Sequence, residues 1–352
     1  MLSSVLSLLA LQAAAGNYAA RPKLRAPELE LAIHASAEII SIEVTNRDTI
    51  PLTLVADAHL LALDITEPKP TDPKKARHFR PKTIRCALPL GIRPSNDGAR
   101  QLVIPPGASY KENLDARFLC FTQKEHAALV ENAIVVGRLG FVGRVGSKPK
   151  KTATKGSAIV RDASEATTFP LAEIGSSPIT ISTAAAEPHD ASNTPLSVEL
   201  SRTIDVATSF EAPLQVSLKN EQKQLTHIRL KPEALRLTVY TPEGKGVPCD
   251  VVAMKTNPLR ELYATLGSKG KVSFTASLSS ICPHNTFESQ GLYRMIGSYD
   301  TSRWRDDNER AHAFSGRLDN NAPNGTWIRI RQGKHPLHRS EPTLAAPETP
   351  TP

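Results

Sequence analysis

The stretch Leu235-Arg236-Leu237-Thr238-Val239 decides the fold, because it occurs twice in the chain in closely related form. Its counterpart, Leu61-Ala62-Leu63-Asp64-Ile65, lies 174 positions earlier, and both stretches carry an apolar residue at every second position. An apolar period of two predicts a β-strand with one buried face. A strand that recurs with the same pattern indicates a tandem repeat.

Other segments recur in the same order on both sides of this strand. Ile42–Asn46 matches Val216–Asn220, again at an offset of 174, and both strands end in asparagine. The first copy carries 11 more residues than the second between the shared strand and the next match. Five matches in one order predict two copies of the same domain. The remaining matches pair Leu29–Ile33 with Leu196–Leu200, Ala133–Phe141 with Gly291–Tyr299, and Pro178–Ser182 with Trp327–Ile330.

The four cysteines follow the same repeat. Cys86 and Cys120 are 34 positions apart, and Cys249 and Cys282 are 33 apart. Of the three possible pairings, the repeat favours Cys86–Cys120 and Cys249–Cys282, because each copy then closes on itself. We place the two cysteines of a pair on neighbouring antiparallel strands, at one end of a sandwich. Each bridge should stabilise its domain by about 3–4 kcal/mol.

The predicted fold is mainly β, with two tandem immunoglobulin-like antiparallel β-sandwiches. Segments rich in Pro, Gly, Asn and Asp separate the strands, as turns require. The 28 prolines argue against long helices. About seven strands per copy fit an immunoglobulin-like sandwich. One helix is expected, between Thr122 and Asn132, with Leu129 and Val130 buried.

The ends of the chain indicate export. Residues 1–15 read as a signal peptide with a leucine-rich core and an Ala-x-Ala site before Gly16, although no Lys or Arg precedes the apolar run. Paired cysteines also favour a secreted or periplasmic location over the alternative, a cytosolic protein with a frayed N-terminus. No other run has the length of a transmembrane segment. We predict a first domain over 24–182, a linker over 183–194, a second domain over 195–333 and a disordered Pro- and Thr-rich tail over 334–352.

No catalytic signature is present. The ten histidines form no metal-binding motif, and the chain lacks a nucleophile elbow and a phosphate-binding glycine loop. The repeat uses all four cysteines for disulfides. We therefore predict a non-catalytic protein with no catalytic residues, no metal and no cofactor.

Basic residues are concentrated in two segments of the first copy, Thr66–Arg85 and Arg138–Arg161, in a chain of net charge +8. Such segments either contact polyanions or are merely solvated loops. The low aromatic content, 5%, argues against nucleic acid. We expect an exported binding or structural protein of the cell envelope or extracellular space. It should be a monomer whose partner is an anionic envelope polysaccharide or another envelope protein. The candidate polyanion-binding residues are Lys74, Lys75, Arg77, Arg80, Lys148, Lys150, Lys151 and Lys155.

Turn motifs in both copies carry a resemblance to a known family. The second copy has Leu218-Lys219-Asn220, the turn Thr241–Val247 and the strand Gly291–Met295, and the first copy has Ile104-Pro105-Pro106-Gly107. This order resembles the bacterial intracellular-proteinase-inhibitor family and similar envelope sandwiches. The resemblance implies an immunoglobulin-like sandwich. It also implies an alternative function, inhibition of an extracellular proteinase through a protruding loop, either Asn257-Pro258-Leu259-Arg260 or the segment Ser147–Gly156.

Overall fold

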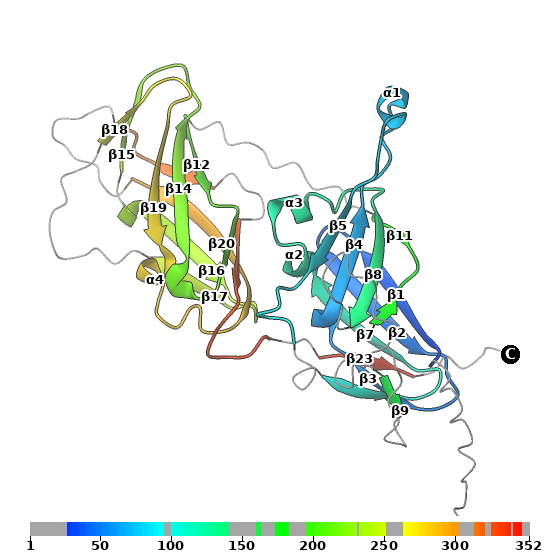
Figure 1. The fold of residues 1–352 in the computed structure, drawn as a ribbon. Helices are drawn as coiled ribbons and strands as arrows, with labels where there is room; N and C mark the ends of the chain where they lie inside the picture. Colours follow the sequence, from blue (N-terminus) through cyan, green and yellow to red (C-terminus); the bar gives the residue numbers. More distant parts are fainter. Residues whose placement is uncertain are drawn as a thin grey trace, which may run out of the picture.

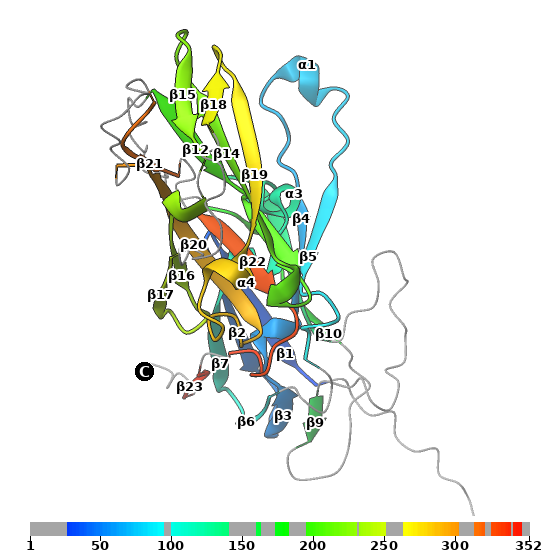
Figure 2. The same ribbon diagram turned by 90° about the vertical axis from the view of Figure 1, so that its left-hand side faces the viewer.

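The computed structural model contains a mainly β protein with two hydrophobic cores (Figures 1 and 2). It confirms the predicted fold class of antiparallel β-sandwich architecture. Among the described residues, no helix is long and apolar enough to cross a membrane. The structure describes residues 27–94, 100–140, 160–162, 173–182, 195–230, 232–250, 263–302, 313–320, 325–338 and 341–346.

The first sandwich packs a sheet of order β1-β2-β7-β23 against a sheet of order β10-β8-β4-β5, with β11 also paired to β8. A small sheet of order β6-β3-β9 extends one end. The strands are β1 (Leu29–Ala35), β2 (Ile39–Asn46), β3 (Leu52–Val55), β4 (Leu61–Thr66), β5 (Thr83–Ala87), β6 (Gln101–Ile104), β7 (Ser109–Asp115), β8 (Ile134–Gly140), β9 (Val160–Asp162), β10 (Glu173–Gly175), β11 (Ile179–Thr180) and β23 (Thr343–Ala345).

The second sandwich packs a sheet of order β12-β14-β19 against a sheet of order β13-β22-β20-β16-β17, with β21 also paired to β20. The β13–β22 pair is parallel, and β15 and β18 form a separate ribbon. The strands are β12 (Leu196–Leu200), β13 (Thr203–Val206), β14 (Pro213–Asn220), β15 (Thr226–Arg229), β16 (Leu235–Tyr240), β17 (Gly246–Asp250), β18 (Tyr263–Leu266), β19 (Lys271–Ser277), β20 (Gly291–Asp300), β21 (Arg317–Asp319) and β22 (Thr326–Ile330).

The described helices are all a single turn: α1 (Pro73–Ala76), α2 (Ala116–Leu119), α3 (Gln123–His126) and α4 (Leu278–Ile281), with 3-10 turns η1 (Ala58–Leu60), η2 (Ser209–Glu211) and η3 (Pro232–Ala234). The helix expected between Thr122 and Asn132 is therefore shorter than predicted. It begins at Thr122 with a capping box and is followed by turns, and Val130 is exposed rather than buried. Asn132 has a left-handed backbone with φ of 64°, which a helix does not allow.

The two sandwiches share one strand order, so the repeat is structural as well as sequential. The sheet β1-β2-β7 corresponds to β12-β14-β19, and β8-β4-β5 corresponds to β20-β16-β17. The extra residues of the first copy lie between β4 and β5, where residues 67–82 replace a turn of residues 241–245 and account for the 11-residue difference. This longer connection carries α1 and projects away from the sandwich (Figure 1).

Strands β2 and β14 each end in an asparagine whose side chain holds the following turn by hydrogen bonds to main-chain groups. Asn46 is fully buried, its Nδ2 donates to the carbonyls of Ile50 and Ile104, both at 2.9 Å, and its Oδ1 accepts from the Asp48 amide at 2.9 Å. Asn220 is also fully buried and makes the same kind of contacts in the second copy. A buried amide that satisfies main-chain groups on both sides of a turn explains why both strands end in the same residue.

The strand pairing corrects the predicted match between β8 and β20 by two residues. Gly137 lies opposite Leu63 on β4, and Gly297 lies opposite Leu237 on β16, so these two glycines are the equivalent positions. A slip of two residues keeps every side chain on its face, and a period-two pattern therefore does not reveal it. Both glycines make room for a bulky neighbour, because a Cβ atom would come within 3.0 Å of Ile33 in the first copy and within 2.8 Å of Leu200 in the second.

Both expected disulfides, Cys86–Cys120 and Cys249–Cys282, are present. Their location differs from the prediction, which placed the two cysteines of a pair on neighbouring strands. Cys86 is in β5, which pairs with β4, whereas Cys120 follows α2, which continues from β7 of the opposite sheet. Each bridge therefore joins the two sheets of its sandwich. Two such bridges favour an oxidising, non-cytoplasmic compartment.

The C-terminal segment is not wholly disordered, which corrects the prediction for residues 334–352. Leu337 is buried against the first core although it follows the last strand of the second sandwich. Thr343–Ala345 form β23, which pairs antiparallel with β7 of the first sandwich. The end of the chain thus returns from the second sandwich to the first. The predicted signal peptide and linker lie outside the described residues.

Aromatic and guanidinium groups join the two sandwiches. Trp327 of β22 faces the guanidinium of Arg117, whose Cζ is 5.1 Å from the indole ring. Arg329, also on β22, stacks on Phe121 at 4.3 Å and donates to the Phe118 carbonyl at 3.4 Å. Stacking of this kind contributes up to about 2 kcal/mol per pair when water is excluded. The contacts place α2 and α3 beside β22 and β12, and this arrangement creates the cleft described next.

Candidate functional site

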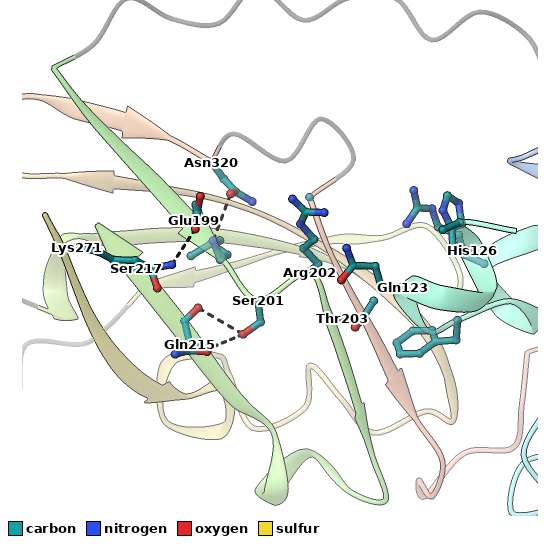
Figure 3. Close-up of a pocket in the computed structure, with 15 residues that line it drawn as sticks. Gln123, His126, Glu199, Ser201, Arg202, Thr203, Gln215, Ser217, Lys271 and Asn320 are labelled. Atoms are coloured by element: carbon teal, nitrogen blue, oxygen red, sulfur yellow. Dashed lines mark hydrogen bonds and ion pairs between the residues drawn. The ribbon is translucent and has the colours of Figure 1, made fainter. Parts of the chain in front are cut away.

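A cleft of about 550 Å³ lies between the two sandwiches (Figure 3). Its volume is within the range of about 300–1,000 Å³ that is usual for ligand sites. The segment containing α2 and α3 forms one wall, and β12, β13, β14 and β19 form the other. The lining residues with polar or charged side chains are Arg117, Gln123, His126, Glu199, Ser201, Arg202, Thr203, Gln215, Ser217, Lys271 and Asn320.

Local hydrogen bonds hold both walls. On the first wall, Thr122 and Glu125 cap α3 reciprocally, with Glu125 N donating to Thr122 Oγ1 at 3.2 Å. On the second wall, Gln215 N donates to Ser201 Oγ at 2.9 Å, which fixes the turn between β12 and β13 next to β14. Arg202 stands on this turn, and its carbonyl accepts from Trp327 N at 3.0 Å. Arg202 is therefore positioned by β22, the same strand that carries Trp327 and Arg329 at the interface between the two sandwiches.

The cleft has an excess of positive charge. Arg117, Arg202 and Lys271 line it, and Glu199 is the one carboxylate among its lining residues. Glu199 is matched by Lys271, whose Nζ lies 3.1 Å from Oε2. Arg202 is exposed and has no ion pair within the described part of the chain. Arg202 therefore gives the cleft an attraction for anions, whereas the charge of Arg117 is partly offset by the nearby carboxylates of Asp115 and Glu38.

His126 is the side chain of the cleft whose ordinary pKa lies nearest to pH 7. Its Nε2 is buried and has no hydrogen-bond partner among the described residues. Burial, followed by the charge of Arg117, lowers the pKa of His126 below its ordinary value of 6.5, against the opposing effect of a backbone hydrogen bond with Ala37. The lowered pKa favours the neutral ring at pH 7.

We expect the lowered pKa of His126 to make the fold less stable in mild acid. Because the unfolded chain binds the proton more readily, the contribution of neutral His126 is complete above pH 6.5 and is lost as pH falls below that value, with a slope of at most about 1.4 kcal/mol per pH unit. The variant His126→Gln should flatten this part of the stability curve, measured by urea unfolding between pH 5 and pH 7.5. The control His284→Gln replaces an exposed histidine and should keep the wild-type slope. A wild-type slope in His126→Gln would contradict the assignment.

The predicted basic residues do not meet in one described site. Lys74 and Lys75 lie in α1, and Arg77 and Arg80 follow it on the β4–β5 connection; the side chains of Lys74, Arg77 and Arg80 are exposed. Figures 1 and 2 show α1 at the end of the molecule towards which β15 and β18 also project. The other predicted residues, Lys148, Lys150, Lys151 and Lys155, lie outside the described residues. Both predicted inhibitory loops lie there as well, so the inhibitor alternative stays a prediction.

Sequence reasoning missed the cleft, because its charged residues come from distant segments and form no local motif. It also missed a buried polar cluster in the first sandwich. There, Glu112 accepts from Arg100, Tyr110 and the Ala58 amide, and the Asp57 carboxylate lies 2.8 Å from His59 Nδ1. Buried charged residues within apolar strand patterns are the signal that could have revealed this cluster. Among the described residues, no group of three or more His, Cys, Asp or Glu side chains is arranged to hold a metal ion.

Comparison with known proteins gives no relative that identifies the chain. No protein-family model and no curated protein matches the sequence. A structural match is the crystal structure of red sea bream transglutaminase, with 12% sequence identity and a TM-score of 0.19. The match covers 90% of this chain but 32% of the transglutaminase, so the chain spans about a third of that enzyme's length. A score this low carries no argument about fold or activity.

Proposed function

We propose that this chain is an exported, non-catalytic protein that binds an anionic polysaccharide of the cell envelope in the cleft between two immunoglobulin-like sandwiches. The strand orders support the immunoglobulin-like assignment. In the first copy the sheet β1-β2-β7 packs against the sheet containing β8-β4-β5, and in the second copy the equivalent sheets are β12-β14-β19 and the one containing β20-β16-β17. Export is supported by the two disulfides.

One observation carries the proposal: the cleft combines the positive charge of Arg202, which has no ion pair among the described residues, with neutral hydrogen-bonding side chains. Arg202 supplies the exposed cation, and Ser201, Thr203 and Gln215 on the same wall supply hydroxyl and amide groups. Sugar hydroxyls pair with such groups, and carboxylate or sulfate substituents pair with guanidinium. A polymer that extends beyond the cleft could also reach the exposed basic residues around α1.

The proposal predicts retention on heparin and on immobilised polygalacturonate at low salt, but not on neutral dextran. Arg202→Gln should weaken binding roughly threefold to tenfold and should reduce the salt dependence by about one counterion, because one charge contact is removed. Isothermal titration calorimetry with heparin at two salt concentrations measures both effects. The matched control Lys223→Gln removes an exposed charge outside the cleft and should bind within twofold of the wild type.

Different outcomes identify which part of the proposal is wrong. If Arg202→Gln binds like the wild type while Lys74→Gln combined with Arg77→Gln loses binding, the α1 connection and not the cleft is the site. Equal retention on dextran would contradict recognition of negative charge. Preference for single-stranded DNA over both polysaccharides would contradict the assigned partner class.

A further inference from the structure

A buried histidine and a buried aspartate form a pair in the first sandwich, outside the cleft. Asp57 is fully buried and caps η1, where its carboxylate accepts from the His59 amide at 3.1 Å. The same carboxylate oxygen lies 2.8 Å from Nδ1 of His59, whose side chain is 5% exposed. The carboxylate therefore fixes the orientation of the imidazole ring and holds a proton on Nδ1.

His59 also lines a second pocket, which has a volume of about 330 Å³. Because Nδ1 points towards Asp57, the opposite edge of the ring, with Nε2, is the part that lines the pocket. Nε2 has no hydrogen-bond partner among the described residues, and it is not completely shielded from water. When the ring carries its proton on Nδ1, Nε2 has a lone pair that can accept a hydrogen bond. The pocket thus contains an acceptor whose position is fixed from behind.

The rest of the pocket lining is largely apolar and aromatic, and it comes from both sandwiches. Phe118 packs edge-on against His59, with the two ring centroids 5.3 Å apart. A lining of this kind favours a flat apolar ring over an extended polar chain. The apolar and aromatic lining residues include Phe118, Tyr240, Pro242, Leu292, Trp327 and Leu337.

The charged groups of the pocket offset each other. Asp115 and Arg294 both line it, and the positive charge of Arg294 acts on the Asp115 carboxylate. A ligand with many polar groups would leave several of them without partners, at a cost of about 1–3 kcal/mol each. These features favour a neutral ring with one hydroxyl group over a sugar or an ionised compound. The remaining polar side chains are few, and they come from Asn113, Tyr240, Thr241 and the exposed His338.

We propose that this second pocket, the His59 pocket, binds a small neutral aromatic compound with one hydroxyl group, such as a phenol. The hydroxyl donates a hydrogen bond to Nε2 of His59, and the ring packs among Phe118, Tyr240 and Trp327. Asp57 is a positioning residue, because it holds the proton on Nδ1 and keeps Nε2 as the acceptor. The volume is near the lower end of the range for ligand sites, as a single ring requires. The His59 pocket shares no lining residue with the cleft, so the proposal does not depend on polysaccharide binding.

The test uses the full-length protein and p-cresol, a neutral phenol, as the probe. Long-range proton–nitrogen NMR spectra of the histidine rings should show an Nε2 signal that shifts and saturates as p-cresol is added. The absence of this signal in His59→Gln assigns it. Toluene has the same ring and methyl group without the hydroxyl. It should bind about tenfold more weakly than p-cresol, because it cannot make the hydrogen bond to His59.

A bulky residue at the pocket provides a test that leaves the buried pair intact. Asn113 is an exposed residue of β7 that lines the His59 pocket, so Asn113→Trp should weaken p-cresol binding at least tenfold by filling the space. The matched control Val103→Trp changes an exposed strand residue outside the pocket and should bind within twofold of the wild type. Arg202→Gln should also bind p-cresol like the wild type, which separates this test from that of the cleft.

Several results would overturn the proposal. If Asn113→Trp binds p-cresol as tightly as the wild type, the compound binds elsewhere. Binding that leaves the Nε2 signal unchanged would remove His59 from the site, and equal binding of toluene would mean that the hydroxyl is not recognised. Tighter binding of methyl glucoside than of p-cresol would assign the pocket to sugars instead. Failure of the wild type to bind p-cresol at millimolar concentration would contradict the assigned ligand class.

Discussion

Replacing Glu112 by alanine should destabilise the first sandwich by about 3–5 kcal/mol, because the change leaves a largely buried guanidinium without its carboxylate. Arg100 Nη2 lies 2.5 Å from Glu112 Oε2, and the carboxylate is almost completely buried. The same oxygen accepts from the Ala58 amide at 3.1 Å and from the Tyr110 hydroxyl. Burial, followed by the charge of this carboxylate, raises the pKa of Tyr110, so the phenol remains a donor at every physiological pH.

Urea unfolding followed by circular dichroism measures the loss, and hydrogen exchange of peptides from each half of the chain separates the two sandwiches. Tryptophan fluorescence does not separate them, because Trp327 packs against Arg117 of the first sandwich. We expect the strands of the first sandwich to lose protection at a lower urea concentration than those of the second. Glu112→Gln keeps the shape and one acceptor and should cost less than Glu112→Ala. If both variants unfold at the wild-type urea concentration, the cluster does not stabilise the sandwich.

Replacing Asn220 by alanine should destabilise the second sandwich by about 2–4 kcal/mol, because several buried main-chain groups lose their partner at once. Asn220 Nδ2 donates to the carbonyls of Gln224 at 2.7 Å and Leu266 at 3.0 Å, and Oδ1 accepts from the Gln222 amide at 2.9 Å. Asn46→Ala should cost a similar amount in the first sandwich, since the two residues are equivalent.

Chemical denaturation of each variant tests this equivalence. Asn220→Ala should lower mainly the stability of the second sandwich, and Asn46→Ala mainly that of the first, as hydrogen exchange of peptides from each half of the chain measures them. Asn285→Ala, which changes an exposed asparagine, should leave both within about 0.5 kcal/mol of the wild type. A large loss of stability in one sandwich and none in the other would mean that Asn46 and Asn220 do not have the same structural role.

Local pattern predicted the strands well, because each strand has one buried face. The matches at Leu61–Ile65, Ile42–Asn46 and Leu29–Ile33 all have the predicted register in the structure. The match of β8 with β20 was wrong by two residues, since a two-residue slip leaves the apolar face unchanged. The repeat predicted which cysteines pair. It did not predict that each disulfide joins opposite sheets, because the order of the strands depends on the whole sandwich.

By itself, the sequence determined two mainly β copies and two internal disulfides, because alternation and repeat spacing are properties of neighbouring residues. It did not reveal the cleft, whose walls come from α3 and from β12 to β19, or the return of Thr343–Ala345 to β7. The tertiary structure alone decided these features. Both depend on how the two sandwiches pack, through Trp327, Arg329 and the segments opposite them, and contacts between residues more than 200 positions apart leave no period in a sequence.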